Sequence, residues 1–193
     1  MSGARVMVVA DTHLSARTPE AVANWHAVAA AVEAGRPDLV LHLGDASLDG
    51  SSSDEDLLLV RELLDALPVP WRAIPGNHDI GDNPNPVTPE DHHIRPDRID
   101  AWRRVIGPDY WSTDLGSWTV VALNAQLAGS GLAAEAEQWA WLDATLGAVP
   151  PDRPVALAVH KPIEASAEEI AAAPVYRFVP EPARGRLTGY DER

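Results

Sequence analysis

The sequence contains no cysteine among its 193 residues. This absence excludes disulfide bonds and thiolate metal sites, so any bound metal ion has to be held by oxygen atoms and imidazole nitrogens. Apolar residues make up 46% of the chain, which is near the globular average and excludes a disordered or fibrous protein. A chain of this length is expected to form one domain with a substantial core.

Basic residues are also few: Lys and Arg number 15 against 29 Asp and Glu, which gives a formal net charge of −14. Because such a surface repels phosphate backbones and anionic lipids, we expect neither extended nucleic acid nor a membrane as a partner. The first apolar run, Val6–Ala10, is too short for the core of a signal peptide, and no stretch reaches the length of a membrane span. The sequence therefore predicts a soluble, cytoplasmic protein.

Short apolar runs rich in β-branched residues alternate with helical segments along the chain. The predicted strands are 6–10, 39–43, 71–74, 110–115, 118–124 and 155–159, and the predicted helices are 19–35, 54–66, 97–106 and 134–146. The strands at 6–10 and 155–159 are apolar throughout, which is typical of strands buried on both faces. Asp54 is the expected N-cap of its helix. The β-α-β-α-β order of the first half favours an α/β fold with a parallel sheet covered by helices.

The domain organisation that we predict is simple. Residues 1–172 form one domain, and residues 173–193, with scattered Pro, Gly and charge, form an irregular tail. The segment 81–96 carries four prolines and no periodicity, so it is predicted to be a long loop, and loops of that length are often functional. One role that such a loop could have is to form a rim that faces the substrate.

Four polar clusters each follow directly after a predicted apolar strand. They are Asp11-Thr12-His13, Gly44-Asp45, Gly76-Asn77-His78-Asp79 and His160. Because the carboxyl ends of parallel strands share one edge of an α/β sheet, where ligands bind, these distant clusters are predicted to meet.

The residue types in these clusters indicate a site for divalent metal ions. Carboxylate, imidazole and amide groups together suit Mn, Fe or Zn better than Cu or Ca. Asp11 and His13 can both reach one ion if the strand leaves its pleat between them. The two oxygens of Asp45 can bridge two ions about 3.5–4 Å apart, as in two-metal hydrolases. His78 followed by Asp79 suggests an imidazole with a carboxylate that fixes its orientation.

The order and residue types of these clusters resemble the sequence motifs of the calcineurin-like metallophosphoesterase superfamily. The matching segment runs from Val6 to Pro162, and its Asp-Thr-His and Gly-Asn-His-Asp wording is similar to the cyclic-nucleotide phosphodiesterase-like subset. The resemblance implies a β-sandwich of two mixed sheets flanked by helices. It also implies an enzyme with two divalent ions, Mn, Fe or Zn, that hydrolyses phosphodiester or phosphomonoester bonds with a hydroxide that bridges the metals.

The resemblance also implies a role for each site residue. Asp11 and His13 would bind the first metal ion, Asn77 and His160 the second, and Asp45 would bridge the two. The catalytic residues would be His78, placed over the scissile phosphate, and Asp79, its partner.

The family pattern ends with a Gly-His-x-His element, and this sequence has no histidine after His160. We therefore expect the last strands to be missing and each ion to keep three of its protein ligands. Two alternatives follow: a truncated, catalytically impaired remnant that acts as a weak metal-binding or protein-interaction module, or a partner chain that supplies the absent ligands. The sequence favours a small phosphorylated substrate, such as a nucleotide, but leaves monoester, diester, cyclic nucleotide and pyrophosphate open, and the oligomeric state as well.

Another histidine, His42, lies within the predicted strand 39–43. We expect it to pack in the sheet, with a role behind the metal ligands as the alternative.

Overall fold

The structure is a computed structural model that describes residues 3–84 and 88–161. Its strands are β1 (Val6–Val9), β2 (Leu39–Leu43), β3 (Trp71–Ile74), β4 (Trp111–Leu115), β5 (Trp118–Ala122) and β6 (Val155–Ala158). Its α-helices are α1 (Pro19–Gly35), α2 (Asp54–Asp65), α3 (Asn77–Ile80), α4 (Pro96–Val105) and α5 (Ala133–Ala148), and two 3₁₀ turns lie at Glu90–His92 and Ala125–Leu127. The predicted domain boundary at residue 172, the tail after it and the strands expected to be missing lie outside the described residues.

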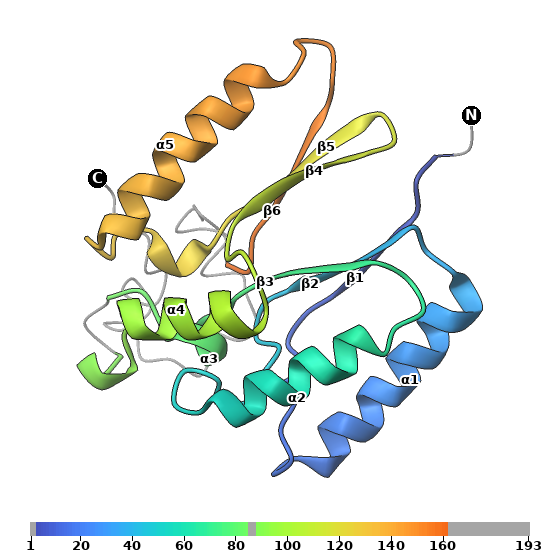
Figure 1. The fold of residues 1–193 in the computed structure, drawn as a ribbon, viewed down its shortest axis with the longest axis vertical. Coiled ribbons are helices and arrows are strands. Elements are labelled where there is room, and N and C mark those ends of the chain that lie inside the picture. Colours follow the sequence, from blue (N-terminus) through green and yellow to red (C-terminus); the bar gives the residue numbers. More distant parts are fainter. Residues whose placement is uncertain (1–2, 85–87, 162–193) are drawn as a thin grey trace, which may run out of the picture.

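The strands form two sheets of three strands each. The first sheet has the order β1-β2-β3 and is parallel throughout its described strands. The second has the order β4-β5-β6, in which β4 and β5 form an antiparallel hairpin and β6 joins β5 in parallel. Helices α1 and α2 lie along one side of the first sheet and the second sheet lies on its other side, while α5 flanks the second sheet (Figure 1).

The first sheet is covered on both faces, and successive side chains of β2 point alternately into two hydrophobic clusters. Val40 packs with Trp25 of α1 and Leu57 of α2 in a large cluster against the helices. Leu39 and Leu41, which point the other way, pack with residues of the second sheet in a separate cluster. This double burial explains why β2 is an unbroken apolar run apart from His42.

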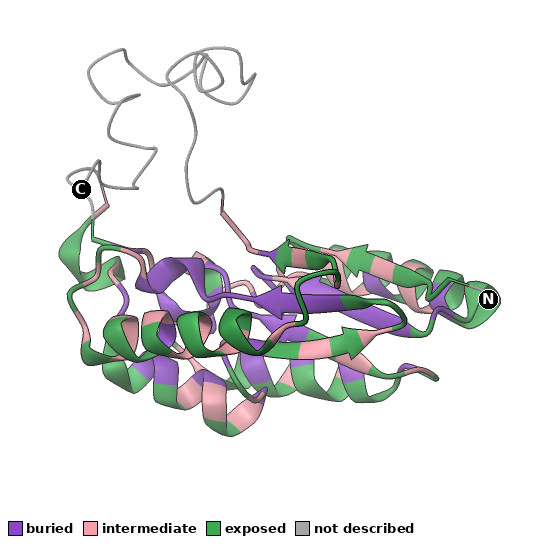
Figure 2. Ribbon diagram, turned by 90° about the horizontal axis from the view of Figure 1, so that it is seen from above, coloured by how far each residue is buried: buried purple, intermediate pink, exposed green. Residues whose placement is uncertain are grey.

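The two edge strands differ from the prediction that both of their faces are buried. Val8 of β1 is 57% exposed and Leu157 of β6 is 54% exposed. In the register of the first sheet Val8 lies beside Leu41, so it points toward the layer between the sheets, where Leu41 is buried. The prediction was wrong because β1 and β6 each lie at the edge of their three-stranded sheet, and apolar composition alone does not distinguish an edge strand from a central one. Figure 2, coloured by burial, shows buried residues gathered in the strands at the centre of the molecule and exposed residues on its outer elements.

The N-cap of helix α2 lies one residue earlier in the chain than the predicted Asp54. The N-cap is Ser53, whose hydroxyl oxygen accepts a hydrogen bond from the backbone N–H of Glu55 at 3.2 Å. Asp54 therefore lies in the first turn, where its carboxylate still opposes the positive end of the helix dipole. Among the described residues, no helix has both the length and the apolar character that are needed to cross a bilayer.

Candidate metal centre

The loops that leave β1 and β2 run side by side and are joined through their backbones. The N–H groups of Asp11 and His13 donate to the carbonyl oxygens of Gly44 and Asp45 at 3.0 and 3.1 Å. These bonds continue the pairing of β1 with β2 beyond the end of the sheet. The prediction that the first two polar clusters meet is therefore confirmed.

Three of the predicted metal ligands have left-handed backbone conformations. The φ angles are 56° at Asp11, 45° at His13 and 50° at Asp45. Residues with a Cβ atom rarely adopt such angles, although Asp and His tolerate them better than most. Strain of this kind persists only where the surroundings fix it, and it is concentrated at functional sites.

The side chains gather in two groups that share one carboxylate. In the first group the ligand atoms of His13, Asp45 and His78 all lie within 4.8 Å of one another, and in the second those of Asp11, Asp45 and His160 do so. Asp45 is thus the common member, as expected of a bridging carboxylate. The grouping differs from the one that the resemblance implies, since Asp11 lies with His160 and His13 with His78. Asn77 begins α3, directly before His78 in the chain, and is not a member of either group.

Asp45 and His160 each shift the pKa of the other. Their side chains are 7% and 8% exposed, and Nε2 of His160 lies 3.5 Å from Oδ1 of Asp45. Burial alone would raise the pKa of Asp45, but its interaction with His160 and the N–H of His78 lower it overall. Burial likewise opposes protonation of His160, and the carboxylate of Asp45 nevertheless raises the pKa of that imidazole. The carboxylate of Asp45 is therefore kept ionised at a position where its negative charge can attract a cation.

The ring orientation of two histidines suits metal chemistry. Nδ1 of His160 lies 2.8 Å from the carbonyl oxygen of Leu43, and Nδ1 of His78 lies 2.8 Å from that of Leu48. A carbonyl oxygen can only accept, so Nδ1 carries the proton in both rings and Nε2 of the neutral ring keeps its lone pair. A backbone carbonyl on the far nitrogen is the usual companion of a metal-ligating histidine. The donor set and these orientations fit a divalent cation.

Asp79 lies behind the site and is fully buried. Its two oxygens accept hydrogen bonds from the N–H groups of Gly76, Ala46 and Ser47 and from the hydroxyl of Ser47, at 2.6–3.2 Å. Burial raises the pKa of Asp79 against the opposing effect of these bonds. The carboxylate ties the loop after β3 to the loop after β2, while the orienting acceptor of His78 is the carbonyl of Leu48.

Two glycines make the close approach of these loops possible. A Cβ atom on Gly44 would lie 2.6 Å from Nδ1 of His160, and one on Gly76 would lie 2.2 Å from Oδ1 of Asp45. Both distances are shorter than any van der Waals contact, so a larger residue at either position would displace a candidate ligand.

The substitution Gly76→Ala is expected to remove metal binding and to destabilise the fold by about 1–3 kcal/mol, the usual effect of overpacking a tight interior. The matched control is Gly147→Ala in α5, where an added Cβ meets nothing within 4 Å and alanine favours the helix by about 0.5–1 kcal/mol. Urea unfolding and calorimetric titration with Mn²⁺ measure both effects. Unchanged Mn²⁺ affinity in Gly76→Ala would contradict the tight contact with Asp45.

The segment that follows β6 contains a residue that was not singled out from the sequence. Lys161, directly after His160, donates to the carboxylate of Asp82 and to Oε1 of Gln126, the latter at 3.1 Å. These contacts join the segment after β6 to the loop that follows α3 and to the 3₁₀ turn that follows β5. The sequence signal was only the position next to a predicted ligand. The carbonyl of Leu48 was missed because backbone acceptors carry no signal in the sequence.

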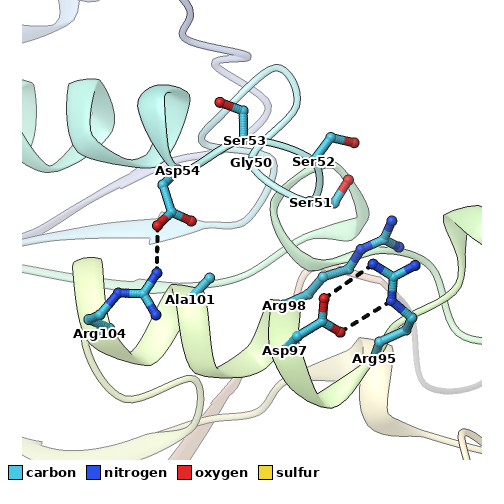
Figure 3. Close-up of a pocket in the computed structure, with 10 residues that line it drawn as sticks. All are labelled: Gly50, Ser51, Ser52, Ser53, Asp54, Arg95, Asp97, Arg98, Ala101 and Arg104. Carbon is cyan, nitrogen blue, oxygen red and sulfur yellow. Dashed lines mark hydrogen bonds and ion pairs between the residues drawn. The ribbon is translucent and has the colours of Figure 1, made fainter.

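A cavity of about 420 Å³ lies between the N-terminus of α2 and helix α4. Figure 3 shows three arginines in its lining, and the protein's own acceptors engage all of them. Arg95 pairs with Asp97, Arg104 pairs with Asp54, and Arg98 donates to two backbone carbonyls. None of the predicted ligands lines this cavity, so the candidate centre remains the edge where the strand-end loops meet.

A two-sheet α/β fold with carboxylate and imidazole donors at the strand ends is the arrangement of a metal-dependent hydrolase. The chain belongs to the calcineurin-like phosphoesterase family, whose sequence model matches residues 4–183. A comparison with curated proteins finds no match. Among solved structures, the chain is similar to a dimetal phosphatase from Danio rerio, with a TM-score of 0.56 and 16% identity over 85% of this chain and 71% of that chain. The family and the fold predicted from the sequence are thus confirmed.

Proposed function

We propose that this chain hydrolyses phosphoester bonds with two divalent metal ions held around Asp45. The observation that carries the proposal is that this one buried carboxylate belongs to two groups of ligand atoms. Within each group, all ligand atoms lie within 4.8 Å of one another. A shared carboxylate between two donor sets is the usual arrangement of a two-metal site. We further propose Mn, Fe or Zn as the ions, because the donors are oxygen and imidazole.

Five side chains would hold the ions: Asp11, His13, Asp45, Asn77 and His160. Two divalent ions there would neutralise charge on a phosphoryl group and lower the pKa of a water molecule. The chain's own contribution is to hold the ligand atoms in position before the ions bind. The left-handed turns and the buried hydrogen bonds of Asp79 do this, so little reorganisation is needed when substrate binds.

His78 is the proposed proton donor to the leaving oxygen. Its Nδ1–H donates to the carbonyl of Leu48 at 2.8 Å, which fixes the ring and leaves Nε2 to take up a proton and transfer it. Its ring also meets that of His13 edge-on, with centroids 4.5 Å apart. That proximity favours a second role, in which His78 is a third ligand beside His13 and Asp45.

We propose a small phosphorylated molecule, such as a nucleotide, as the substrate. A net charge of −14 disfavours long phosphate polymers, whose many charges would face acidic surface outside the metal site. A single phosphate group that reaches the ions avoids most of that repulsion. Diester and monoester bonds both suit the donor set.

The first test is metal-dependent turnover of bis(4-nitrophenyl) phosphate and 4-nitrophenyl phosphate by protein that has been stripped with a chelator. We expect Mn²⁺, Fe²⁺ or Zn²⁺ to raise the rate at least about 100-fold above the stripped protein, since the ions supply several kcal/mol of transition-state stabilisation. Circular dichroism confirms that the stripped protein is folded. Tight Mn²⁺ binding without turnover of either compound would favour a metal-binding module, and absence of binding would overturn the proposal.

A further inference from the structure

A chain of hydrogen bonds runs from β2 to the segment between two candidate ligands. Oγ1 of Thr12 lies 2.9 Å from Nε2 of His42 and 3.0 Å from the carbonyl oxygen of Ala46. Thr12 stands between Asp11 and His13, and Ala46 follows Asp45. One hydroxyl group therefore connects both ligand loops to an imidazole inside the first sheet.

The direction of these bonds follows from the acceptor at the end. The carbonyl of Ala46 can only accept, so the hydroxyl of Thr12 donates to it and receives a hydrogen bond from Nε2–H of His42. Nε2 therefore carries the proton of the neutral His42 ring, which leaves a lone pair on Nδ1. This agrees with its position, because it is 1% exposed beside Trp25 of α1 and its Nδ1 has no hydrogen-bond partner among the described residues.

Charges around His42 also favour the neutral ring. Burial is the main cause that lowers its pKa to about 4, and the nearby imidazoles of His160 and His13 lower it further against the opposing charge of Asp45. At neutral pH His42 thus offers one fixed donor. A lone pair left without a partner is tolerated better in a protein interior than an orphaned N–H group.

The segment that Thr12 anchors needs support. The residues on both sides of it have positive φ angles, 56° at Asp11 and 45° at His13, and a strained turn keeps its shape only while its surroundings hold it. The backbone bonds to Gly44 and Asp45 fix the amides of the turn. The hydroxyl of Thr12 adds a side-chain anchor through His42. This anchor lies on the helix side of the first sheet, because His42 shares a face of β2 with Val40, which packs with Trp25 of α1.

We propose that Thr12 and His42 are positioning residues, which hold Asp11 and His13 in the geometry that binds a divalent cation without touching the cation. The proposal rests on the proposed function for its account of the metal. Its own content is the relay from the His42 imidazole through the Thr12 hydroxyl to the Ala46 carbonyl.

Two pairs of variants test the relay by calorimetric titration with Mn²⁺. Thr12→Val removes the hydroxyl at constant shape, and His42→Leu removes the donor; we expect each to weaken Mn²⁺ binding about 10–100-fold, as loss of a residue behind a metal ligand does. Thr12→Ser keeps the hydroxyl, and His42→Gln places an N–H near the position of Nε2. Both are expected to stay within about threefold of the original affinity.

The double variant Thr12→Val/His42→Leu should bind Mn²⁺ about as well as either single variant, because the two residues act through one chain of bonds. Ile99→Val, which removes a buried methyl group from α4, is the control for general destabilisation and should leave the affinity unchanged. Equal affinity of Thr12→Val and the original chain, or additive losses in the double variant, would overturn the proposal.

A measurement without metal keeps this test separate from the test of function. Nitrogen-15 NMR of the imidazole rings should show His42 with its proton on Nε2 at pH 7, and Thr12→Val should speed the exchange of that proton with water. A proton on Nδ1 overturns the relay even if Mn²⁺ binds well. If the original chain binds no Mn²⁺, the proposed function fails while the NMR result still decides whether the relay exists.

Discussion

Asp45→Asn is expected to lower metal-dependent phosphoesterase activity by at least about 1000-fold, which corresponds to ~4 kcal/mol of transition-state stabilisation. The reason is geometric, because both groups of ligand atoms contain this carboxylate. Asparagine keeps the shape and can still accept the hydrogen bond from the N–H of His78, which is 2.9 Å long, but it loses the negative charge. Titration with Mn²⁺ and steady-state rates with bis(4-nitrophenyl) phosphate measure the result.

The matched control for Asp45→Asn is Asp109→Asn. Asp109 is also a buried carboxylate, with an ion pair to Arg103 at 2.7 Å and a hydrogen bond from Asn124. Its replacement is expected to reduce stability while metal affinity persists. If Asp45→Asn retains more than about a tenth of the original activity, a bridging role for Asp45 is excluded, since loss of a bridging charge should cost several kcal/mol.

His78→Asn is expected to lower kcat about 100- to 10,000-fold, the usual contribution of a general acid, with little change in Mn²⁺ affinity. The side-chain amide of asparagine can still donate to the carbonyl of Leu48, as Nδ1 of His78 does. The variant therefore keeps the local contact and removes only the nitrogen that would carry the proton. Comparison of kcat with the Mn²⁺ dissociation constant is the measurement.

The same variant decides between the two roles of His78. If His78 is a third ligand of the group that contains His13 and Asp45, His78→Asn should weaken Mn²⁺ binding as strongly as His13→Asn does. The control is His92→Asn, at an exposed histidine in the Glu90–His92 turn, which should change neither quantity. A proton-donor role requires that kcat falls while affinity holds.

Much of this architecture could be predicted from the sequence because its signals are local. The apolar runs of β1, β2 and β3 alternate with amphipathic or alanine-rich helices, and each strand is followed by a polar cluster. Since parallel strands end at one edge, the meeting of Asp11 and Asp45 followed from topology, whereas His160 reaches them from the segment that follows β6 of the second sheet. The hairpin β4–β5 was equally readable, from Gly116-Ser117 between two β-rich runs.

The remaining features depend on tertiary contacts that carry no local signal. The acceptor of His78 is a backbone carbonyl, and Asp79 turns away to bind the loop after β2. Edge and central strands have similar composition, so the exposure of Val8 could not be foreseen. The grouping of Asp11 with His160 depends on loop conformations with positive φ, which sequence patterns specify only where glycine marks them.

The candidate ligands are spread unevenly along the chain, so they become available in a fixed order during synthesis. His13, Asp45 and His78 come from the first part of the chain, whereas His160 contacts Leu43 across 117 residues. At roughly 5–20 residues per second of translation, several seconds separate the emergence of these two groups from the ribosome. In the proposed two-metal site, the group of His13, Asp45 and His78 would thus be complete before the second sheet is made, and the group that contains His160 only after β6 has joined the fold.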